Sequence, residues 1–92
     1  MAPVLDHKQI LEIARRHGAS RVRVFGSYAR GQQTATSDID LLVDLELHRD
    51  LFDLVELKRE LEERLGRRFD VLTEQALSPY IRESVLQDAR PL

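Results

Sequence analysis

The chain has 92 residues, of which 42% are hydrophobic and 33% charged, with a formal net charge of −2 and no cysteine. This length is expected to form one domain, residues 1–92, with a modest core and a single site. The missing cysteine excludes disulfides and thiolate metal sites. The slight negative charge argues against an extensive nucleic-acid-binding surface. Without an N-terminal signal or an apolar run near about 20 residues, we expect a cytoplasmic protein that does not contact membranes.

Apolar periodicity and capping residues predict alternating helices and strands. The expected elements are a helix from Asp6 to Gly18, a strand over 21–25, one helical turn over 27–31, a strand over 38–45, a helix over 51–65, a strand over 69–73, and a helix opened by Ser78 and Pro79. The order α-β-α-β-α-β-α predicts a small α/β (α+β) domain whose sheet is covered mainly on one face.

Two of these helices carry apolar stripes, which we interpret as core. The first stripe consists of Leu51, Leu54, Val55, Leu57, Leu61 and Leu65. The second consists of Ile81, Val85, Leu86 and Ala89. Side chains at this helical spacing share one face, so both helices are expected to pack against the sheet.

Carboxylates mark the second and third predicted strands. Asp38 and Asp40 are two residues apart, so they project from the same strand face. An Asp-x-Asp pair at a strand start can be a solvated surface or part of a cation site. Asp70 favours the cation site, because it supplies a third carboxylate within the apolar run Phe69–Leu72. Oxygen ligands of this kind suit Mg²⁺, which commonly binds one or two carboxylates together with substrate phosphates.

A glycine-serine turn precedes the paired carboxylates. Gly26 permits positive φ and close backbone approach, and Ser27 adds a hydroxyl, so the turn is typical of a phosphate-binding loop. A Walker A loop is excluded, because Gln32 and Gln33 stand where Lys and Ser/Thr should be. Arg30 could steady a phosphate or pair with a nearby acid.

Two further features near these motifs have alternative interpretations. Tyr28, inside the turn, could flank a nucleotide, but packing is the preferred interpretation. Arg67 and Arg68 could meet a partner or RNA, although a solvated strand entrance is preferred. Asp44 shares the parity of the paired carboxylates one pleat further on, and we interpret it as surface.

The combination of motifs resembles the DNA polymerase β-like nucleotidyltransferase superfamily. Gly26-Ser27, a ten-residue spacer and Asp38-Ile39-Asp40-Leu41 match its signature. Within it, Gly-Ser-Tyr-Ala-Arg-Gly followed by Ser-Asp-Ile-Asp-Leu-Leu-Val is similar to the minimal nucleotidyltransferases, or MNT proteins. The resemblance spans nearly the whole chain, because Asp70 falls where the family has its third carboxylate.

The resemblance implies a mixed sheet and transfer of AMP, or another nucleoside monophosphate, from a metal-bound NTP such as ATP. Asp38 and Asp40 would hold one or two Mg²⁺ ions. Asp70 would share a metal and help deprotonate the acceptor hydroxyl. Gly26 and Ser27 would bind the triphosphate. Family members of this size commonly act as antitoxins of HEPN ribonuclease toxins, and some attach AMP to a toxin tyrosine.

The resemblance leaves three functions open. The preferred one is an adenylyltransferase that modifies a HEPN toxin, because no acceptor-binding domain is apparent beside the nucleotidyltransferase core. The second is a non-catalytic antitoxin that neutralises the toxin by complex formation. The third is a transferase acting on a small hydroxylated molecule such as an aminoglycoside.

Overall fold

The computed structural model describes residues 5–92. Its elements are α1 (His7–Arg16), β1 (Ala19–Phe25), β2 (Ile39–Leu45), α2 (Leu51–Leu65), β3 (Phe69–Leu72), the 3₁₀ turn η1 (Glu74–Ala76), α3 (Pro79–Asp88) and β4 (Arg90–Pro91). The strands form one mixed sheet in the order β3-β2-β1-β4. β1 pairs antiparallel with β2 and β4, and β2 pairs parallel with β3. The predicted fold class is confirmed.

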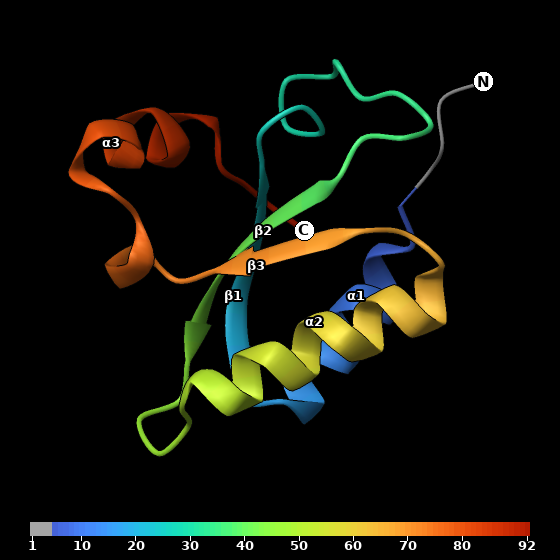
Figure 1. Ribbon diagram of the computed structural model, residues 1–92, viewed down its shortest axis with the longest axis vertical. Coiled ribbons are helices and arrows are strands. Elements are labelled where there is room, and N and C mark those ends of the chain that lie inside the picture. The colour runs from blue at the N-terminus through green and yellow to red at the C-terminus, as the bar shows by residue number, and fades with distance from the viewer. Residues whose placement is uncertain (1–4) are drawn as a thin grey trace.

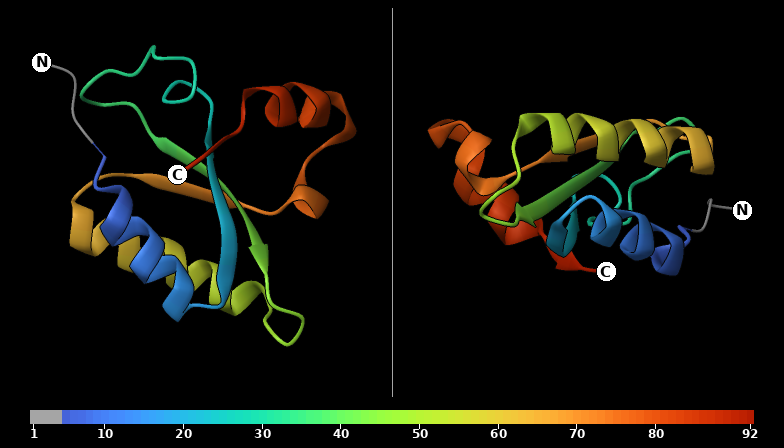
Figure 2. Two further views of the ribbon diagram at one scale, coloured as in Figure 1. Left: turned by 180° about the vertical axis from the view of Figure 1, so that it is seen from behind. Right: turned by 90° about the horizontal axis from the view of Figure 1, so that it is seen from below.

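The two faces of the sheet are covered unequally. α1 and α2 lie together along one face, at the bottom of the view in Figure 1, and bury the main core against it. Ile10, Leu57, Ile39 and Leu41 in this core are fully buried. α3 lies toward the other face, where Val85 contributes to a smaller cluster (Figure 2). Helices therefore cover mainly one face, as the sequence predicts.

The ends of α2 show how local sequence sets an element's bounds. Asp50 accepts hydrogen bonds from the backbone N–H groups of Phe52 and Asp53, at 2.9 and 3.3 Å. The Asp53 carboxylate accepts one from the Asp50 N–H at 3.0 Å, which completes a capping box. At the other end, Gly66 takes the left-handed conformation with φ of 66°. Both boundaries match the sequence prediction.

Replacing Asp50 with Ala is expected to lower stability, because the side chain satisfies two otherwise unpaired donors of α2. Loss of such a cap costs about 1 kcal/mol, which lowers Tm by roughly 4–8 °C in a domain of this size. Thermal denaturation followed by circular dichroism measures the change. Asp50→Ser, which keeps a capping oxygen, is the control and should retain most of the stability. Equal Tm values for the Ala and Ser variants would contradict the role of the cap.

Residues 27–31 form hydrogen-bonded turns. The Arg30 N–H donates to the Gly26 carbonyl, which is the bond of one helical turn, and the Gln32 N–H then reaches back to the Ser27 carbonyl, so the turn does not continue as a helix. The prediction that the whole stripe of α2 is core is wrong. Leu51 and Val55 are 73% and 61% exposed, whereas Leu54, Leu57 and Leu61 are buried, so the buried face of the helix is narrower than the stripe.

The same holds for α3, which contains no fully buried residue. Ile81 and Leu86 are exposed, and only the end of the helix packs on the sheet. The C-terminal residues Arg90–Pro91 form a short strand that the sequence did not predict. Within residues 5–92, no helix combines the length and apolar character needed to cross a membrane.

Candidate active site

Two of the three predicted carboxylates, Asp40 and Asp70, are adjacent on the sheet face opposite the main core, and Asp38 acts on Asp40 through its charge. Asp40 lies on β2 and is directly paired in register with Asp70 on β3. The strands are parallel, so paired side chains project from the same face and lie side by side. Asp38, just before β2, is exposed, as is Asp70, whereas Asp40 is half-buried. The arrangement is an acidic cluster that opens to solvent on one side.

Burial and the neighbouring carboxylates shift the pKa of Asp40. Its pKa is raised to about 6, from an ordinary 3.8, first by burial and then by the negative charges of Asp70 and Asp38. A hydrogen bond with Asp70 also favours the protonated form of Asp40, while the positive charge of Arg30 partly opposes the shift. The raised pKa therefore reflects burial first and the neighbouring carboxylates second, and Arg30 offsets only part of it.

Gly26 ends β1 directly beside Asp40. Its φ of 73° lies in the left-handed region, which disfavours other residues. A Cβ added to Gly26 would overlap the carboxylate oxygen of Asp40. Two constraints therefore demand glycine here, and the backbone of the turn lies against one of the carboxylates.

The Gly26–Gly31 turn presents backbone donors near the cluster. The N–H groups of Arg30 and Gln32 donate to the carbonyls of Gly26 and Ser27, at 3.1 and 2.9 Å. The amides at the start of such a turn have no acceptor within it and are suited to bind an anion. Ser27 is half-buried at this position. The geometry agrees with the predicted phosphate-binding turn.

Arg30 is paired with an acid in this structure. Its Nη1 lies 2.7 Å from the Asp88 carboxylate at the end of α3, and its Nε donates to Gln32 at 3.2 Å. Of the two interpretations of Arg30 from the sequence, the ion pair is the one observed. The guanidinium is about half exposed and also influences Asp40 electrostatically, so it lies within range of charge in the cluster.

The acidic cluster suits a hard divalent cation. All three donors are carboxylates, the charges of Asp70 and Asp38 add to burial in raising the pKa of Asp40, and two of the three side chains face solvent. Among residues 5–92, no group of three or more His, Asp or Glu side chains is arranged so that it could hold a metal ion by itself. Mg²⁺ does not require such a cage, because it keeps waters and takes ligands from substrate phosphates. The residues therefore fit a cation site that a bound nucleotide would complete.

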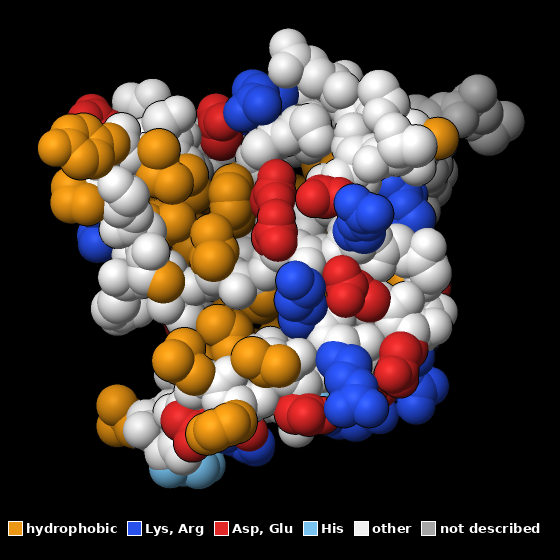
Figure 3. All heavy atoms as spheres, viewed as in Figure 1, with side chains coloured by type: hydrophobic (Ala, Val, Ile, Leu, Met, Phe, Trp, Pro, Cys, Tyr) orange, Lys and Arg blue, Asp and Glu red, His pale blue; other side chains and the backbone are white. Residues whose placement is uncertain are grey.

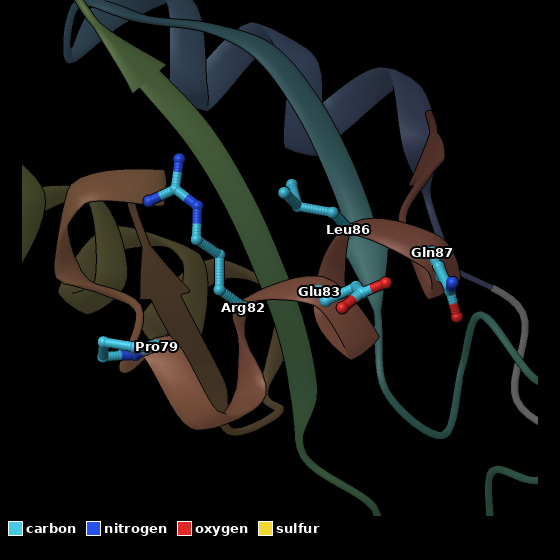
Figure 4. Close-up of a pocket in the computed structure, with 5 residues that line it drawn as sticks. All are labelled: Pro79, Arg82, Glu83, Leu86 and Gln87. Atoms are coloured by element: carbon cyan, nitrogen blue, oxygen red, sulfur yellow. The ribbon is translucent and has the colours of Figure 1, made fainter.

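A separate surface hollow of about 550 Å³ lies along α3. Figure 4 shows its lining residues, which are Pro79, Arg82, Glu83, Leu86 and Gln87. None of the candidate catalytic residues lines it. We place the active site at the carboxylates, because phosphoryl chemistry requires charged groups and a positioned backbone more than it requires an apolar hollow.

Sequence analysis missed the contacts of two arginines around the site. Arg67, interpreted as a solvated strand entrance, donates to the Tyr28 hydroxyl at 2.6 Å and to the Ser37 carbonyl at 3.1 Å. Tyr28 packs against the main core, as the preferred interpretation held. Arg23 is buried and lies 3.2 Å from Glu74 and 3.6 Å from Asp44. Asp44 is therefore an ion-pair partner rather than simple surface.

Comparison with known proteins agrees with this geometry. A family model described as a nucleotidyltransferase domain matches residues 7–92. Over 82 residues, the chain is 46% identical to a provisionally named protein adenylyltransferase of Methanocaldococcus jannaschii, with 89% of this chain and 88% of the relative covered. It is 39% identical over 82 residues to protein adenylyltransferase MntA of Thermococcus cleftensis, with 89% and 81% covered.

Solved structures give the same result. One provisionally described as a minimal nucleotidyltransferase has a TM-score of 0.82 and 50% identity, with 94% of this chain and 88% of that chain covered. A toxin–antitoxin complex with AMP-PNP has a TM-score of 0.81 and 25% identity, with 95% and 72% covered. The resemblance drawn from the sequence is confirmed. The chain belongs to the nucleotidyltransferase domain family, and it is a nucleotidyltransferase of the minimal type.

Proposed function

We propose that this protein transfers AMP from ATP to a hydroxyl group of a partner protein, a HEPN ribonuclease toxin, and thereby acts as its antitoxin. The observation that carries the proposal is the pairing of Asp40 with Asp70 across parallel strands, beside the Gly26 turn. The carboxylates therefore lie beside the backbone turn that we propose binds phosphate. The same placement supports Asp38, Asp40 and Asp70 as catalytic residues, and Gly26, Ser27 and Arg30 as nucleotide-binding residues.

The proposed reaction is a displacement at the α-phosphorus of ATP. The acceptor oxygen forms a bond to the α-phosphorus, the bond from that phosphorus to the bridging oxygen of the β-phosphate breaks, and pyrophosphate leaves. Asp70, the exposed carboxylate on β3, takes the proton of the acceptor hydroxyl. Asp38 and Asp40 would hold Mg²⁺, which supplies positive charge to the phosphate oxygens. The Gly26–Gly31 turn orients the triphosphate.

A protein acceptor is supported by exposed apolar side chains near the site. These residues are Leu47, Leu51, Phe52, Val55, Tyr80, Ile81 and Leu86, all at least 37% exposed. Figure 3 shows hydrophobic side chains gathered over α3 and the start of α2, beside the acidic groups at the centre of the view. Exposed apolar groups gathered in this way are typical of protein-interaction surfaces. The relative named protein adenylyltransferase and the toxin–antitoxin complex agree with such a partner.

Labelled ATP tests the proposal directly. The protein is incubated with Mg²⁺, ATP labelled in the α-phosphate, and a HEPN ribonuclease toxin, and label in the toxin is measured after electrophoresis. Wild type is expected to label the partner, and Asp38→Asn to reduce labelling by roughly a hundredfold or more, because a site carboxylate is lost. Mass spectrometry of the labelled partner then identifies the modified residue, for which we expect a tyrosine.

Asp44→Asn is the matched control. Asp44 shares the strand and face of Asp40 but pairs with Arg21 and Arg23, away from the cluster, and Arg23 retains Glu74 when Asp44 is neutralised. This variant should label the partner as wild type does. Equal labelling by wild type and Asp38→Asn would refute the catalytic assignment. Full protection of cells from the toxin by Asp38→Asn would instead favour neutralisation by binding alone.

A further inference from the structure

Arg67 connects two parts of the candidate site that are distant in the sequence. Its Nη2 donates to the hydroxyl of Tyr28 at 2.6 Å and to the carbonyl of Ser37 at 3.1 Å. Tyr28 lies within the Gly26–Gly31 turn, and Ser37 directly precedes Asp38. One guanidinium therefore contacts both the segment that would bind phosphates and the segment that opens the carboxylate strand.

The position of Arg67 is itself well fixed. Gly66, in the left-handed conformation, ends α2 and turns the chain toward β3. The carbonyl of the next residue, Arg68, accepts a hydrogen bond from the Ile39 N–H at 2.9 Å. Phe69 is held in turn by the Glu62 carboxylate, which accepts its N–H at 3.0 Å. The backbone on both sides of Arg67 is thus anchored to the main core.

The two acceptors differ in how firmly they are held. The Tyr28 ring packs against the main core, and the Arg67 guanidinium carbon lies 5.7 Å from the ring centre. Between Tyr28 and Ser37 the chain is mostly exposed and polar, and its hydroxyl groups, such as Thr34 to Ser37, bond mainly to one another. Such a segment has few constraints of its own. The Arg67 contacts therefore close the loop across its base.

We propose that Arg67 is a positioning residue that fixes the Gly26–Gly31 turn relative to Asp38. The spacing between bound triphosphate and carboxylates then depends on a hydrogen-bonded arginine outside the sequence signature. That the ligand is a nucleoside triphosphate rests on the proposed function, whereas the tether between the two segments does not. Arg67 acts through Tyr28 and Ser37 and is not itself assigned a contact with substrate.

Conservative variants test this role by kinetics. Arg67→Lys keeps the charge but loses the planar fork that reaches two acceptors, and Tyr28→Phe keeps the packed ring but loses the hydroxyl. Each is expected to raise KM for ATP roughly tenfold, the scale of one lost charged hydrogen bond. The double variant should resemble Arg67→Lys, because Tyr28→Phe removes a contact that Arg67→Lys already removes. Arg68→Lys, on the adjacent exposed residue, is the matched control and should leave KM unchanged.

Hydrogen exchange gives a readout that does not depend on activity. In the protein without nucleotide, amides of residues 27–38 should exchange faster in Arg67→Lys and Tyr28→Phe than in wild type, while α2 is unchanged. Unchanged exchange, unchanged KM, or KM effects that multiply in the double variant would each overturn the positioning role. A wild-type protein that binds ATP without transferring AMP would refute only the proposed function, since the Kd of a fluorescent ATP analogue replaces KM in the test.

Discussion

Asp40→Asn protein is expected to transfer AMP at least roughly a hundredfold more slowly than wild type while being more thermostable at neutral pH. The loss follows from removing the carboxylate at the centre of the cluster, between Asp38 and Asp70. The gain follows from the raised pKa of Asp40, because its ionised form is less favourable in the folded protein than in the unfolded chain. Activity and stability should therefore change in opposite directions, as is common at functional sites.

The pH dependence of the stability follows from the direction of this shift. The pKa of Asp40 is about 6 when folded and 3.8 ordinarily, so the folded protein binds the proton more tightly. The stability gained from that proton is complete below about pH 4 and is lost as the pH rises through 6. The variant does not titrate there, so its advantage is absent at pH 4 and present at pH 7.5. Allowing for solvent screening at a half-exposed group, the advantage is about 1 kcal/mol, or roughly 4–8 °C in Tm.

Thermal denaturation at both pH values, with a chelator present, measures this effect. The chelator is needed because a bound cation would offset the repulsion that the wild-type cluster experiences. Asp44→Asn, on the same strand, is again the control, since the substitution removes an ion-pair partner of Arg23 and should give no gain at pH 7.5. A Tm for Asp40→Asn at or below that of wild type at pH 7.5 would contradict the assigned cause.

Gly26→Ala is expected to be the most damaging small substitution near the site. The new Cβ would overlap the Asp40 carboxylate, and alanine is strained at a φ of 73°. The strain costs about 1–2 kcal/mol, and moving the carboxylate adds to it. We expect a Tm lowered by roughly 4–8 °C or more. AMP transfer should fall roughly a hundredfold, because misplacement of about 1 Å is enough for such a loss.

Gly31→Ala separates the strain from the overlap. Gly31 has a similar φ of 69° at the other end of the turn, but a Cβ there has open space around it. This variant should show a comparable loss of stability with far less loss of AMP transfer. If both alanine variants lose transfer equally, the contact with Asp40 is not what requires glycine at position 26.

Much of the fold was predictable from local signals. Asp50 sets the start of α2, because its carboxylate accepts hydrogen bonds from otherwise unpaired amides. Gly66 sets the end, because glycine readily adopts the left-handed conformation. Both effects act within a few residues. Alternation along a strand predicted that Asp38 and Asp40 share a face, and the apolar run around Asp70 marked it as a third site carboxylate, whereas the register that pairs Asp40 with Asp70 is seen only in the structure. Helix caps and strand alternation depend only on residues close together in the sequence.

What could not be predicted depends on contacts between distant segments. Arg67 looks like a solvated residue in the sequence, because nothing near it reveals that Tyr28 and Ser37 lie across from it. Leu51 looks like core, because its helical spacing is correct, yet it is 73% exposed in the structure. The pairing of Arg30 with Asp88 joins residues 58 positions apart. The residues that neighbour an arginine or a leucine in the sequence do not reveal its distant contacts or its exposure.

The position of β3 at the border of the sheet has a consequence for how the site persists over time. β3 spans four residues and is hydrogen-bonded to β2 on one side, whereas β2 lies between two strands. Border strands open locally at lower free energy than interior strands. We therefore expect Asp70 to leave the cluster more often than Asp40, so that local opening of this short strand sets the fraction of molecules in which the carboxylates are aligned.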